Sequence, residues 1–278
     1  RIQDLKVHFD TDDGILHAVD GVNLHIDRSE TLGVVGESGC GKSVTAMTIM
    51  KLLAMPPGRI ANGQIWFEGQ DLVQADAQAM RNLRAKEIAM IFQEPMAALD
   101  PCFTIGHQLA EVLRLQALSE SQVQAKVIEL LEQVKIPNPD EVAARYPHQI
   151  SGGMAQRVGI ARALASEPQI LLADEPTTAL DVTVQAEILA LIRSLSQSRH
   201  MAVVLVTHDW GVVADICDRA LVLRHGEVLE SASVVDLFHR PQHPYTQALL
   251  AANPHSAKPG DVLPTVDEQL MTLTGGAA

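Results

Sequence analysis

The sequence predicts an α/β protein whose central sheet contains parallel strands covered by helices. Short apolar runs at 32–35, 170–173 and 203–206 have the composition of buried strands, and segments with helical periodicity lie between them. The first of these runs is followed at once by a glycine-rich stretch, 36–41, and then by a helical pattern. Because buried strands that alternate with helices form parallel sheets, these observations define the expected fold class.

The composition limits the classes of function. The 278 residues include 21 Lys and Arg and 34 Asp and Glu, which gives a formal net charge of −13. A sequence-independent nucleic-acid binder needs a cationic surface to displace counterions from phosphates, so no nucleic-acid partner is expected. Hydrophobic residues make up 47% of the chain and charged residues 20%, which favours a folded core over disorder.

The distribution of cysteines and apolar residues indicates the cellular compartment in which the protein works. The three cysteines, Cys40, Cys102 and Cys217, lie far apart and form neither a CxxC nor a zinc pattern, which is typical of a reducing environment. Apolar runs stay shorter than the roughly 18 residues of a membrane span, and the N-terminus lacks the pattern of a secretory signal. We therefore expect a soluble protein of the cytoplasm.

The N-terminal third is expected to contain strands and one helix. Residues 1–31 alternate between apolar and polar types, which predicts short strands with a turn at 12–14. After the glycine-rich stretch, a helix is expected from Lys42 to Leu53, where prolines follow. The runs 65–67 and 88–92 are further strand candidates.

From 94 to 165 the sequence changes to helical periodicity, which indicates a helical subdomain inserted into the α/β domain. The alternation then resumes with a strand at 170–173, a helix at 184–195, and strands at 203–206 and 220–223. Composition and periodicity place the end of this domain at residue 252, so the domain is expected to span residues 1–252. Residues 253–278 contain prolines and glycines with little periodicity, so they are expected to form a tail.

A phosphate-binding loop is predicted between the first apolar strand and the helix that follows it. The pattern GxxxxGK[ST] is formed by Gly36, Glu37, Ser38, Gly39, Cys40, Gly41, Lys42 and Ser43. Glycines let backbone N–H groups surround phosphates, Lys42 reaches the β- and γ-phosphates of ATP, and the Ser43 hydroxyl ligates Mg²⁺. Because Cys40 lies beside Lys42 and a helix N-terminus, we expect it to be the most reactive of the three cysteines.

Two carboxylates follow the apolar run at 170–173. Asp174 is expected to hold Mg²⁺, and Glu175 is expected to orient and polarise the water that attacks ATP. An acidic pair at a strand end is common by itself, so this assignment depends on the phosphate loop that accompanies it.

The segment that begins at Ile150 indicates a family. Ser151, Gly152, Gly153 and Met154 resemble the LSGGQ signature of ATP-binding-cassette (ABC) ATPases, with Ile for Leu and Met for Gln. A serine and two glycines at the start of a helix form an anion site. The resemblance implies a P-loop ABC ATPase fold: a mixed sheet core, an antiparallel β subdomain and the inserted helical subdomain. It also implies a head-to-tail dimer, in which this segment completes the ATP site of a second ATPase subunit, the same chain or a homologous one.

Other landmarks of that family occur in order. Gln93 resembles the Q-loop glutamine that contacts Mg²⁺ and the membrane partner, and His208 resembles the switch histidine that touches the γ-phosphate. Asp181, in Ala179-Leu180-Asp181, resembles the D-loop aspartate at the dimer contact. Phe9 resembles the aromatic residue that stacks on adenine, although a single Phe on an amphipathic strand is as often a core residue. Val44 stands where many members carry Thr, which removes a hydroxyl near the phosphates.

Finer resemblances are to the ATPases of peptide/nickel importers, and they lie at 36–39, 91–96, 99–101, 151–154 and 243–246. They imply uptake of di- or oligopeptides, with nickel or a metal chelate as alternatives. The partners are then two integral-membrane permeases, one docked on residues 94–104, and indirectly an extracytoplasmic solute-binding protein. The chain would act as a peripheral subunit at the cytoplasmic face of the inner or plasma membrane. Many members end in a cysteine cluster, but no cysteine follows Cys217, so either the chain is truncated or its branch lacks the cluster.

A non-transport ABC ATPase that acts on DNA or ribosomes is the alternative. DNA-structural members insert long coiled coils between the two nucleotide motifs, whereas about 130 residues without a sustained heptad run separate Gly41 from Ile170 here. Ribosome-acting members carry two cassettes, and this sequence has one. A module that binds ATP without hydrolysing it is disfavoured, because Glu175 and His208 are both present.

Overall fold

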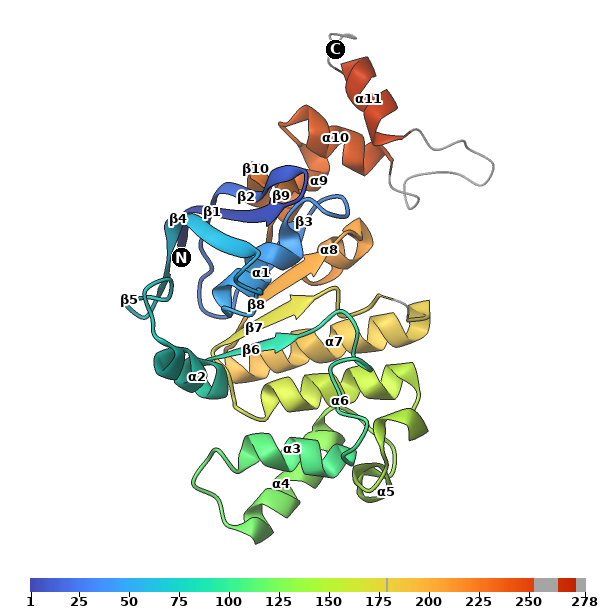
Figure 1. The fold of residues 1–278 in the computed structure, drawn as a ribbon. Coiled ribbons are helices and arrows are strands. Elements are labelled where there is room, and N and C mark those ends of the chain that lie inside the picture. Colours follow the sequence, from blue (N-terminus) through green and yellow to red (C-terminus); the bar gives the residue numbers. More distant parts are fainter. Residues whose placement is uncertain (179, 253–264, 274–278) are drawn as a thin grey trace. The chain divides into compact units, whose positions relative to one another are not determined.

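The computed structural model describes residues 1–178, 180–252 and 265–273 of the chain (Figure 1). These residues form two compact units. The first consists of Arg1–Ala75 together with the described residues from Leu205 on, and the second consists of Asp76–Val204. The chain passes from the second unit back into the first within strand β8 (Ala202–Thr207). In sequence, the second unit is therefore an insertion into the first.

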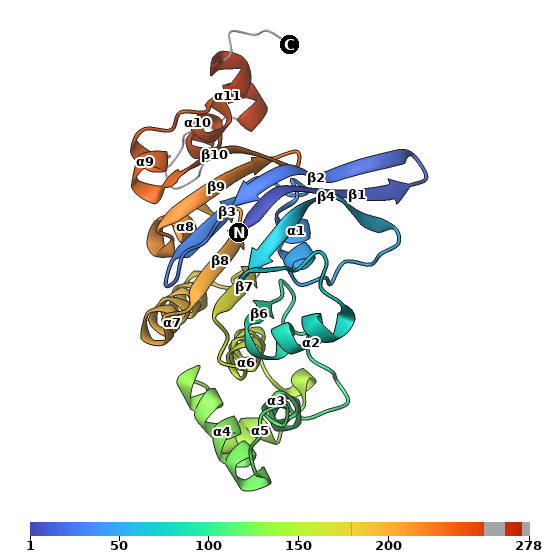
Figure 2. The same ribbon diagram turned by 90° about the vertical axis from the view of Figure 1, so that its left-hand side faces the viewer.

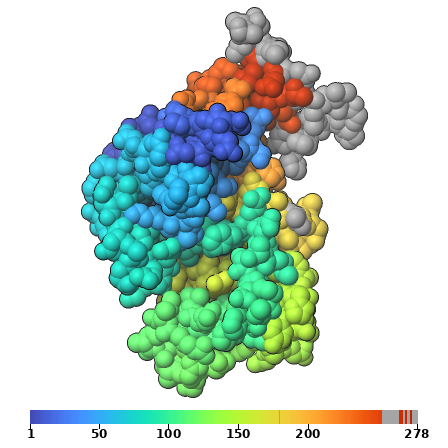
Figure 3. Space-filling model, viewed as in Figure 1, coloured from blue at the N-terminus to red at the C-terminus, as the bar shows by residue number. Residues whose placement is uncertain are grey.

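An antiparallel sheet occupies the N-terminal part of the first unit, with its strands in the order β2-β1-β4-β5. The strands are β1 Ile2–Thr11, β2 Gly14–Leu24, β4 Gly58–Phe67 and β5 Gln70–Asp71. β1 and β2 form a long hairpin (Figure 2), and its residues, dark blue in Figure 3, contribute to the surface. Leu5 and Val7 of β1 are fully buried while Lys6 between them is not, as the alternation in the sequence predicts, but Phe9 is only half-buried, like His8 before it.

A second group of strands in the first unit has mixed directions. β9 (Arg219–Arg224) pairs in parallel with β3 (Thr31–Val35) and antiparallel with β10 (Glu227–Ser233). Every residue of β3 is buried, as expected for an apolar strand covered on both faces. The helices of this unit are α1 Lys42–Ile49, α8 Trp210–Ile216, α9 Val234–His239, α10 Pro244–Ala251 and α11 Val266–Leu273.

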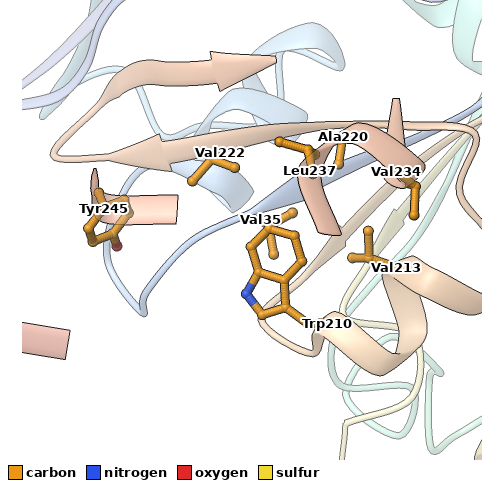
Figure 4. Close-up of a cluster of buried hydrophobic side chains, with 8 residues drawn as sticks. All are labelled: Val35, Trp210, Val213, Ala220, Val222, Val234, Leu237 and Tyr245. Carbon is orange, nitrogen blue, oxygen red and sulfur yellow. The ribbon is translucent and has the colours of Figure 1, made fainter. Parts of the chain in front are cut away.

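A hydrophobic cluster in the first unit packs C-terminal helices against β3 and β9 (Figure 4). Its buried members are Val35, Trp210, Val213, Ala220, Val222, Val234, Leu237 and Tyr245. Trp210 also meets Phe238 edge-on, with ring centroids 5.5 Å apart. Because β3 leads directly into the predicted phosphate loop, this cluster holds the strand from which that loop departs.

The second unit combines a parallel strand pair with helices. β6 (Ile88–Ile91) and β7 (Ile170–Asp174) run parallel, with Ile91 opposite Ala173. This pair confirms the parallel strands predicted from two apolar runs. The helices are α2 Ala77–Lys86, α3 Ile105–Leu113, α4 Glu120–Gln133, α5 Pro139–Ala143, α6 Gly152–Leu164 and α7 Val182–Arg199, with a 3₁₀ turn at Pro147–Gln149.

Helices α3, α4, α5 and α6 pack against one another in the region expected to be helical (Figure 1). Thr104, Ser119 and Ser151 cap α3, α4 and α6, because each side-chain oxygen accepts a hydrogen bond from the backbone N–H three residues further on. Gln122 completes a capping box with Ser119. Each cap satisfies a backbone donor that a helix start would otherwise leave unpaired.

Some helices differ from the prediction. α1 ends at Ile49 rather than at Leu53, because Lys51 adopts a φ of 49° and its Nζ donates to the carbonyls of Val73 and Ala75. α2 was not predicted, since its sequence is polar and only Met80 and Leu83 are buried. None of the helices in the described ranges has both the length and the apolar character of a membrane span.

Helix α11 lies within the stretch expected to be a tail, of which residues 253–264 and 274–278 are outside the described ranges. Val266 and Leu270, four residues apart, both pack against the cluster of Figure 4. A short apolar helix face is therefore present where the sequence showed little periodicity. The domain boundary at 252 and the limits 94–165 of the helical subdomain remain predictions.

Candidate nucleotide-binding site

The predicted phosphate loop connects β3 to α1 within the first unit. Gly41 is the N-cap of α1 and has a φ of 106°, a conformation that would strain any residue with a side chain. A Cβ atom at Gly41 would overlap the carbonyl oxygen of Ala18, and one at Gly36 would overlap that of Leu223. Ser38 and the glycine after it are exposed. The motif glycines therefore allow close backbone packing around the start of α1, where a helix N-terminus attracts anions.

The side chain of Lys42 lies inside the phosphate loop. It is 5% exposed, and its Nζ donates to the carbonyl oxygens of Gly36 and Glu37, each at 2.8 Å. Ser43 and Val44 follow in the first turn and are half-buried. The loop therefore holds a buried positive charge next to a helix N-terminus, and this combination suits phosphate binding.

Cys40 does not have the electrostatic environment that we expected. Its side chain is buried, and burial raises the pKa of its thiol even though Lys42 acts in the opposite direction. The argument for a thiolate at this position is therefore wrong, because desolvation outweighs the nearby positive charge. Burial, and to a lesser extent Asp218, raises the pKa of Cys217 to about 12. Cys102 is the exposed cysteine.

Phe9 lies on β1, opposite Leu16 of β2 and Gly58 of β4. Its ring is half-buried and lies against Gly58, since a Cβ atom there would be 3.0 Å from Phe9 Cε1. Leu16 is 57% exposed. A partly exposed ring beside an exposed apolar side chain offers a surface on which a base can stack. The adenine contact of Phe9 remains a prediction.

In the second unit, Gln93 and Thr178 donate hydrogen bonds to the carboxylate of Glu175. Gln93 Nε2 donates to Glu175 Oε2 at 3.1 Å, and Thr178 Oγ1 donates to the same oxygen at 2.9 Å. Asp174, the last residue of β7, is 4% exposed. Glu175 has a φ of 45°, a left-handed conformation that costs a residue with a side chain about 1–3 kcal/mol.

The structure thus brings together two of the residues singled out in the sequence, Gln93 and Glu175, and it adds Thr178. Sequence reasoning missed Thr178. A hydroxyl three residues after a carboxylate, in a turn, is the signal that could have indicated it, since such side chains bond locally.

The signature segment starts α6. Ser151 is its N-cap, and Ser151 Oγ accepts a hydrogen bond from Met154 N at 3.3 Å. Gly153 lies against α7, because a Cβ atom there would be 3.1 Å from Val184 Cγ1. At Gly152, which is exposed, a Cβ atom would meet nothing within 4 Å. An exposed serine and open space at a helix N-terminus are the features that an anion site requires.

Asp181 caps α7, since its carboxylate accepts a hydrogen bond from Val184 N at 3.0 Å. Of the predicted D-loop, Ala179 lies outside the described residues. Asp181 is exposed at the start of its helix. Its place at a dimer contact remains a prediction.

His208 follows β8 and is exposed. The turn after it is fixed by two hydrogen bonds, from Asp209 N to Thr207 Oγ1 at 3.0 Å and from Gly211 N to Asp209 Oδ1 at 2.7 Å. α8 then begins at the buried Trp210. An exposed imidazole at a fixed strand end suits the contact with a γ-phosphate, which remains a prediction.

The predicted site residues are divided between the two units. Phe9, the phosphate loop and His208 belong to the first, and the others belong to the second. The expected Mg²⁺ ligands, Ser43, Gln93 and Asp174, offer hydroxyl, amide and carboxylate oxygens, which are donors that Mg²⁺ prefers. Within the described ranges, no group of three or more His, Cys, Asp or Glu side chains could hold a metal by itself. The donor set therefore fits a Mg²⁺ that nucleotide phosphates and water also ligate.

The chain is similar in sequence and in fold to known proteins. A family model described as "ABC transporter" matches residues 19–178. The chain is 48% identical over 276 residues to the oligopeptide transport ATP-binding protein OppD of Bacillus subtilis, which covers 99% of this chain and 75% of OppD. It is 46% identical over 267 residues to the dipeptide transport ATP-binding protein DppD of the same organism, which covers 96% of this chain and 80% of DppD. A dimeric ATP-binding cassette solved with ADP and Pi has a TM-score of 0.76 and 29% identity, over 84% of this chain and 97% of the other.

Proposed function

This chain belongs to the ABC transporter family, and we propose that it hydrolyses ATP to drive the uptake of di- or oligopeptides through a membrane transporter. The names of OppD and DppD describe them as oligopeptide and dipeptide transport ATP-binding proteins. The observation that carries the proposal in this chain is the hydrogen bond between Gln93 and Glu175. It connects the residue expected to sense the membrane partner with the carboxylate expected to activate water.

Binding of ATP depends on the phosphate loop. Lys42 can exchange its hydrogen bonds with the carbonyls of Gly36 and Glu37 for bonds with phosphate oxygens. Charge-assisted hydrogen bonds of this kind contribute about 1.5–3 kcal/mol each. Bound Mg²⁺ would neutralise charge on the phosphates, with Ser43, Gln93 and Asp174 as its protein ligands.

Glu175 is the proposed base. Its carboxylate orients a water molecule toward the γ-phosphorus and accepts a proton from it as the new P–O bond forms. The bond from the γ-phosphorus to the bridging oxygen breaks, which yields ADP and phosphate. Thr178 and Gln93 hold the carboxylate in one orientation, so the carboxylate is already positioned before the reaction begins. His208 is proposed to contact the γ-phosphate.

The site is proposed to be completed by a second ATPase subunit. The start of α6, with Ser151, Gly152 and Gly153, would face the γ-phosphate bound to that subunit, and Asp181 would lie at the contact between the two. An ATP whose γ-phosphate is intact then binds both subunits, whereas ADP binds one. The related cassette that was solved as a dimer with ADP and Pi supports the dimeric assembly.

The segment 94–104 is the proposed contact with a permease. Gln108 holds this loop in shape, because its side chain exchanges hydrogen bonds with Asp100 N and O at 2.9 Å and donates to Phe103 O at 3.0 Å. Met96 and Phe103 are exposed on it. A preformed loop with exposed apolar side chains suits docking on another protein. The chain would then work as a peripheral subunit on the cytoplasmic side of the membrane.

The test is transport by a reconstituted complex. The chain is purified with the permeases and solute-binding protein encoded beside its gene, placed in liposomes, and supplied with ATP and a labelled peptide. Uptake that requires ATP and is lost in K42A supports the proposal. Stimulation of ATPase activity by nickel or a metal chelate instead of peptides would assign the other cargo, and failure to associate with any permease would contradict the transport function.

A further inference from the structure

The first turn of helix α10 contains a buried tyrosine that the predicted site does not include. Tyr245 is 0% exposed and belongs to the hydrophobic cluster, together with Val35 and Val222 (Figure 4). The family model ends at residue 178, so it does not cover this helix. The segment 243–246, which contains this tyrosine, resembles the corresponding segment of the peptide/nickel importer ATPases.

The hydroxyl of Tyr245 reaches the phosphate loop. Its Oη donates a hydrogen bond to Glu37 Oε2 at 2.8 Å. Burial raises the pKa of the phenol, and its bond with the Glu37 carboxylate raises that pKa further. Tyr245 therefore stays protonated under working conditions and acts only as the donor of this bond.

Both the side-chain carboxylate and the backbone carbonyl of Glu37 accept hydrogen bonds. Its carboxylate accepts the bond from Tyr245, and its carbonyl oxygen accepts a bond from Lys42 Nζ at 2.8 Å. Glu37 thus connects helix α10 to Lys42, the lysine expected to hold the phosphates. The bond from Tyr245 therefore restrains the residue whose carbonyl holds Lys42 before that lysine exchanges its backbone bonds for bonds with phosphate.

The tyrosine is anchored independently of the loop. The backbone N–H groups of Gln242 and His243 donate to the carboxylate of Glu230, at 2.8 and 3.0 Å. His243 Nδ1 accepts a bond from Tyr245 N at 3.1 Å, and the Arg224 guanidinium lies 4.8 Å from the centre of the Tyr245 ring. Since β9 and β10 supply these anchors, Tyr245 is a fixed point to which the loop is attached.

We propose that Tyr245 is a positioning residue for the phosphate loop, where it holds the Glu37 carboxylate and so sets the affinity for ATP. The inference rests on the proposed function, because it concerns the same nucleotide site. A carboxylate inside a loop that binds a triphosphate repels the phosphates when it is free to approach them. A neutral donor with a fixed position keeps that charge in one place and preserves the shape of the loop around Lys42.

The experiment compares two hydroxyl deletions in one helix. Y245F removes the bond to Glu37 and keeps the ring, its packing and its contact with Arg224. T246V is the matched control: Thr246 is equally buried, and within the described ranges its hydroxyl has no hydrogen-bond partner. ATP and ADP affinities are measured by calorimetry on the full chain, and kcat and KM by ATPase assay.

We expect Y245F to bind ATP about 3- to 10-fold more weakly, with a kcat within about twofold of wild type and T246V unchanged. The double variant Y245F/E37A should bind ATP as E37A does, because no side-chain acceptor remains for Tyr245 to hold. A purely structural Tyr245 would lower the melting temperature without changing ATP affinity, and that result would overturn the inference. Equal losses in Y245F and T246V would overturn it too.

A measurement on the wild-type chain avoids dependence on a variant. Coupling between sites is reciprocal, so ATP should slow hydrogen exchange of the α10 amides as well as those of the phosphate loop. Protection of the loop without any change in α10 would contradict the inference and leave the proposed function intact. Failure of the wild-type chain to bind ATP would instead contradict the proposed function itself.

Discussion

Gln93 and Glu175 are 82 residues apart in the sequence and are joined by a hydrogen bond of 3.1 Å. The bond follows from strand register. Ile91 lies opposite Ala173 in the parallel pair β6–β7, and each partner of the bond comes two residues after one of them. Because parallel strands end at the same edge of a sheet, the two side chains meet there. A register shift of one residue would separate them.

Replacement of Glu175 by Gln should abolish most hydrolysis. Gln keeps the size and hydrogen bonding of the side chain but cannot accept a proton, so the ATPase rate should fall by about 10²–10⁴-fold while ATP affinity is retained. T178V is the graded control, since it removes the bond from Thr178 to the carboxylate and should cost about tenfold or less. Hydrolysis by E175Q at the wild-type rate would remove Glu175 from its role.

The same variant should report on assembly. With ATP held unhydrolysed between two subunits, E175Q should shift from monomer toward dimer, and ADP should not have this effect. Light scattering after size-exclusion chromatography at high protein concentration measures it, first for the chain alone and then with a homologous ATPase subunit. Equal dimerisation in ADP would contradict the shared-site arrangement.

Gln93→Glu should change the pH dependence of hydrolysis. The new carboxylate would lie beside Glu175, and a like charge there raises the pKa of Glu175. A base with a raised pKa is protonated, and therefore inactive, up to a higher pH, so the acidic limb of the kcat profile should move upward. Q93A is the control, because it removes the bond without adding charge. A limb that moves equally in both variants would contradict the electrostatic explanation.

Cys102 should react with maleimide before the other two cysteines. Cys102 is exposed, whereas burial raises the thiol pKa of both Cys40 and Cys217, so their thiolate fractions at neutral pH are small. Peptide mapping after brief labelling at pH 7 gives the order. Labelling of Cys40 should accelerate as pH rises toward its raised pKa, and ATP should slow it. First labelling at Cys40 would show that the loop opens readily.

Lys42→Ala should abolish ATP binding, whereas removal of residues 253–278 should leave it intact. The lysine supplies a full charge to the phosphates, so its loss should abolish detectable binding. The deletion keeps α10 and Tyr245, so binding should survive. It removes the packing of Val266 and Leu270, which should lower the unfolding free energy by about 1–3 kcal/mol. Calorimetry and thermal melts measure both, and loss of ATP binding in a folded truncation would move the domain boundary.

Local patterns were sufficient to predict the strands and the motif residues. β3 and β7 are short apolar runs that end at a glycine or a carboxylate, and both are buried throughout or nearly so. The phosphate loop is equally local, because eight consecutive residues define it. In such segments the neighbours along the chain carry the information, so one sequence is enough.

Features that depend on distant residues could not be predicted in the same way. The bond between Tyr245 and Glu37 joins positions 208 apart, and no pattern in either segment indicates the other. The environment of Cys40 was misjudged for the same reason: its sequence neighbours suggest a thiolate, but the folded chain buries it. α1 stops early because Lys51 bonds to carbonyls of a later segment. In each case tertiary contacts outweigh the local preference.

The close backbone packing around the phosphate loop sets an order of events during synthesis. Gly36 and Gly41 fit against the carbonyls of Leu223 and Ala18, and Gly226 N donates to Cys40 O at 3.0 Å. A nascent chain that has emerged only through the first helix therefore contains the whole motif and Ala18, but not Leu223 or Gly226, which pack against the loop. ATP can stabilise the chain only after the turn at Gly226 has left the ribosome, so nucleotide binding marks the completion of folding rather than its nucleus.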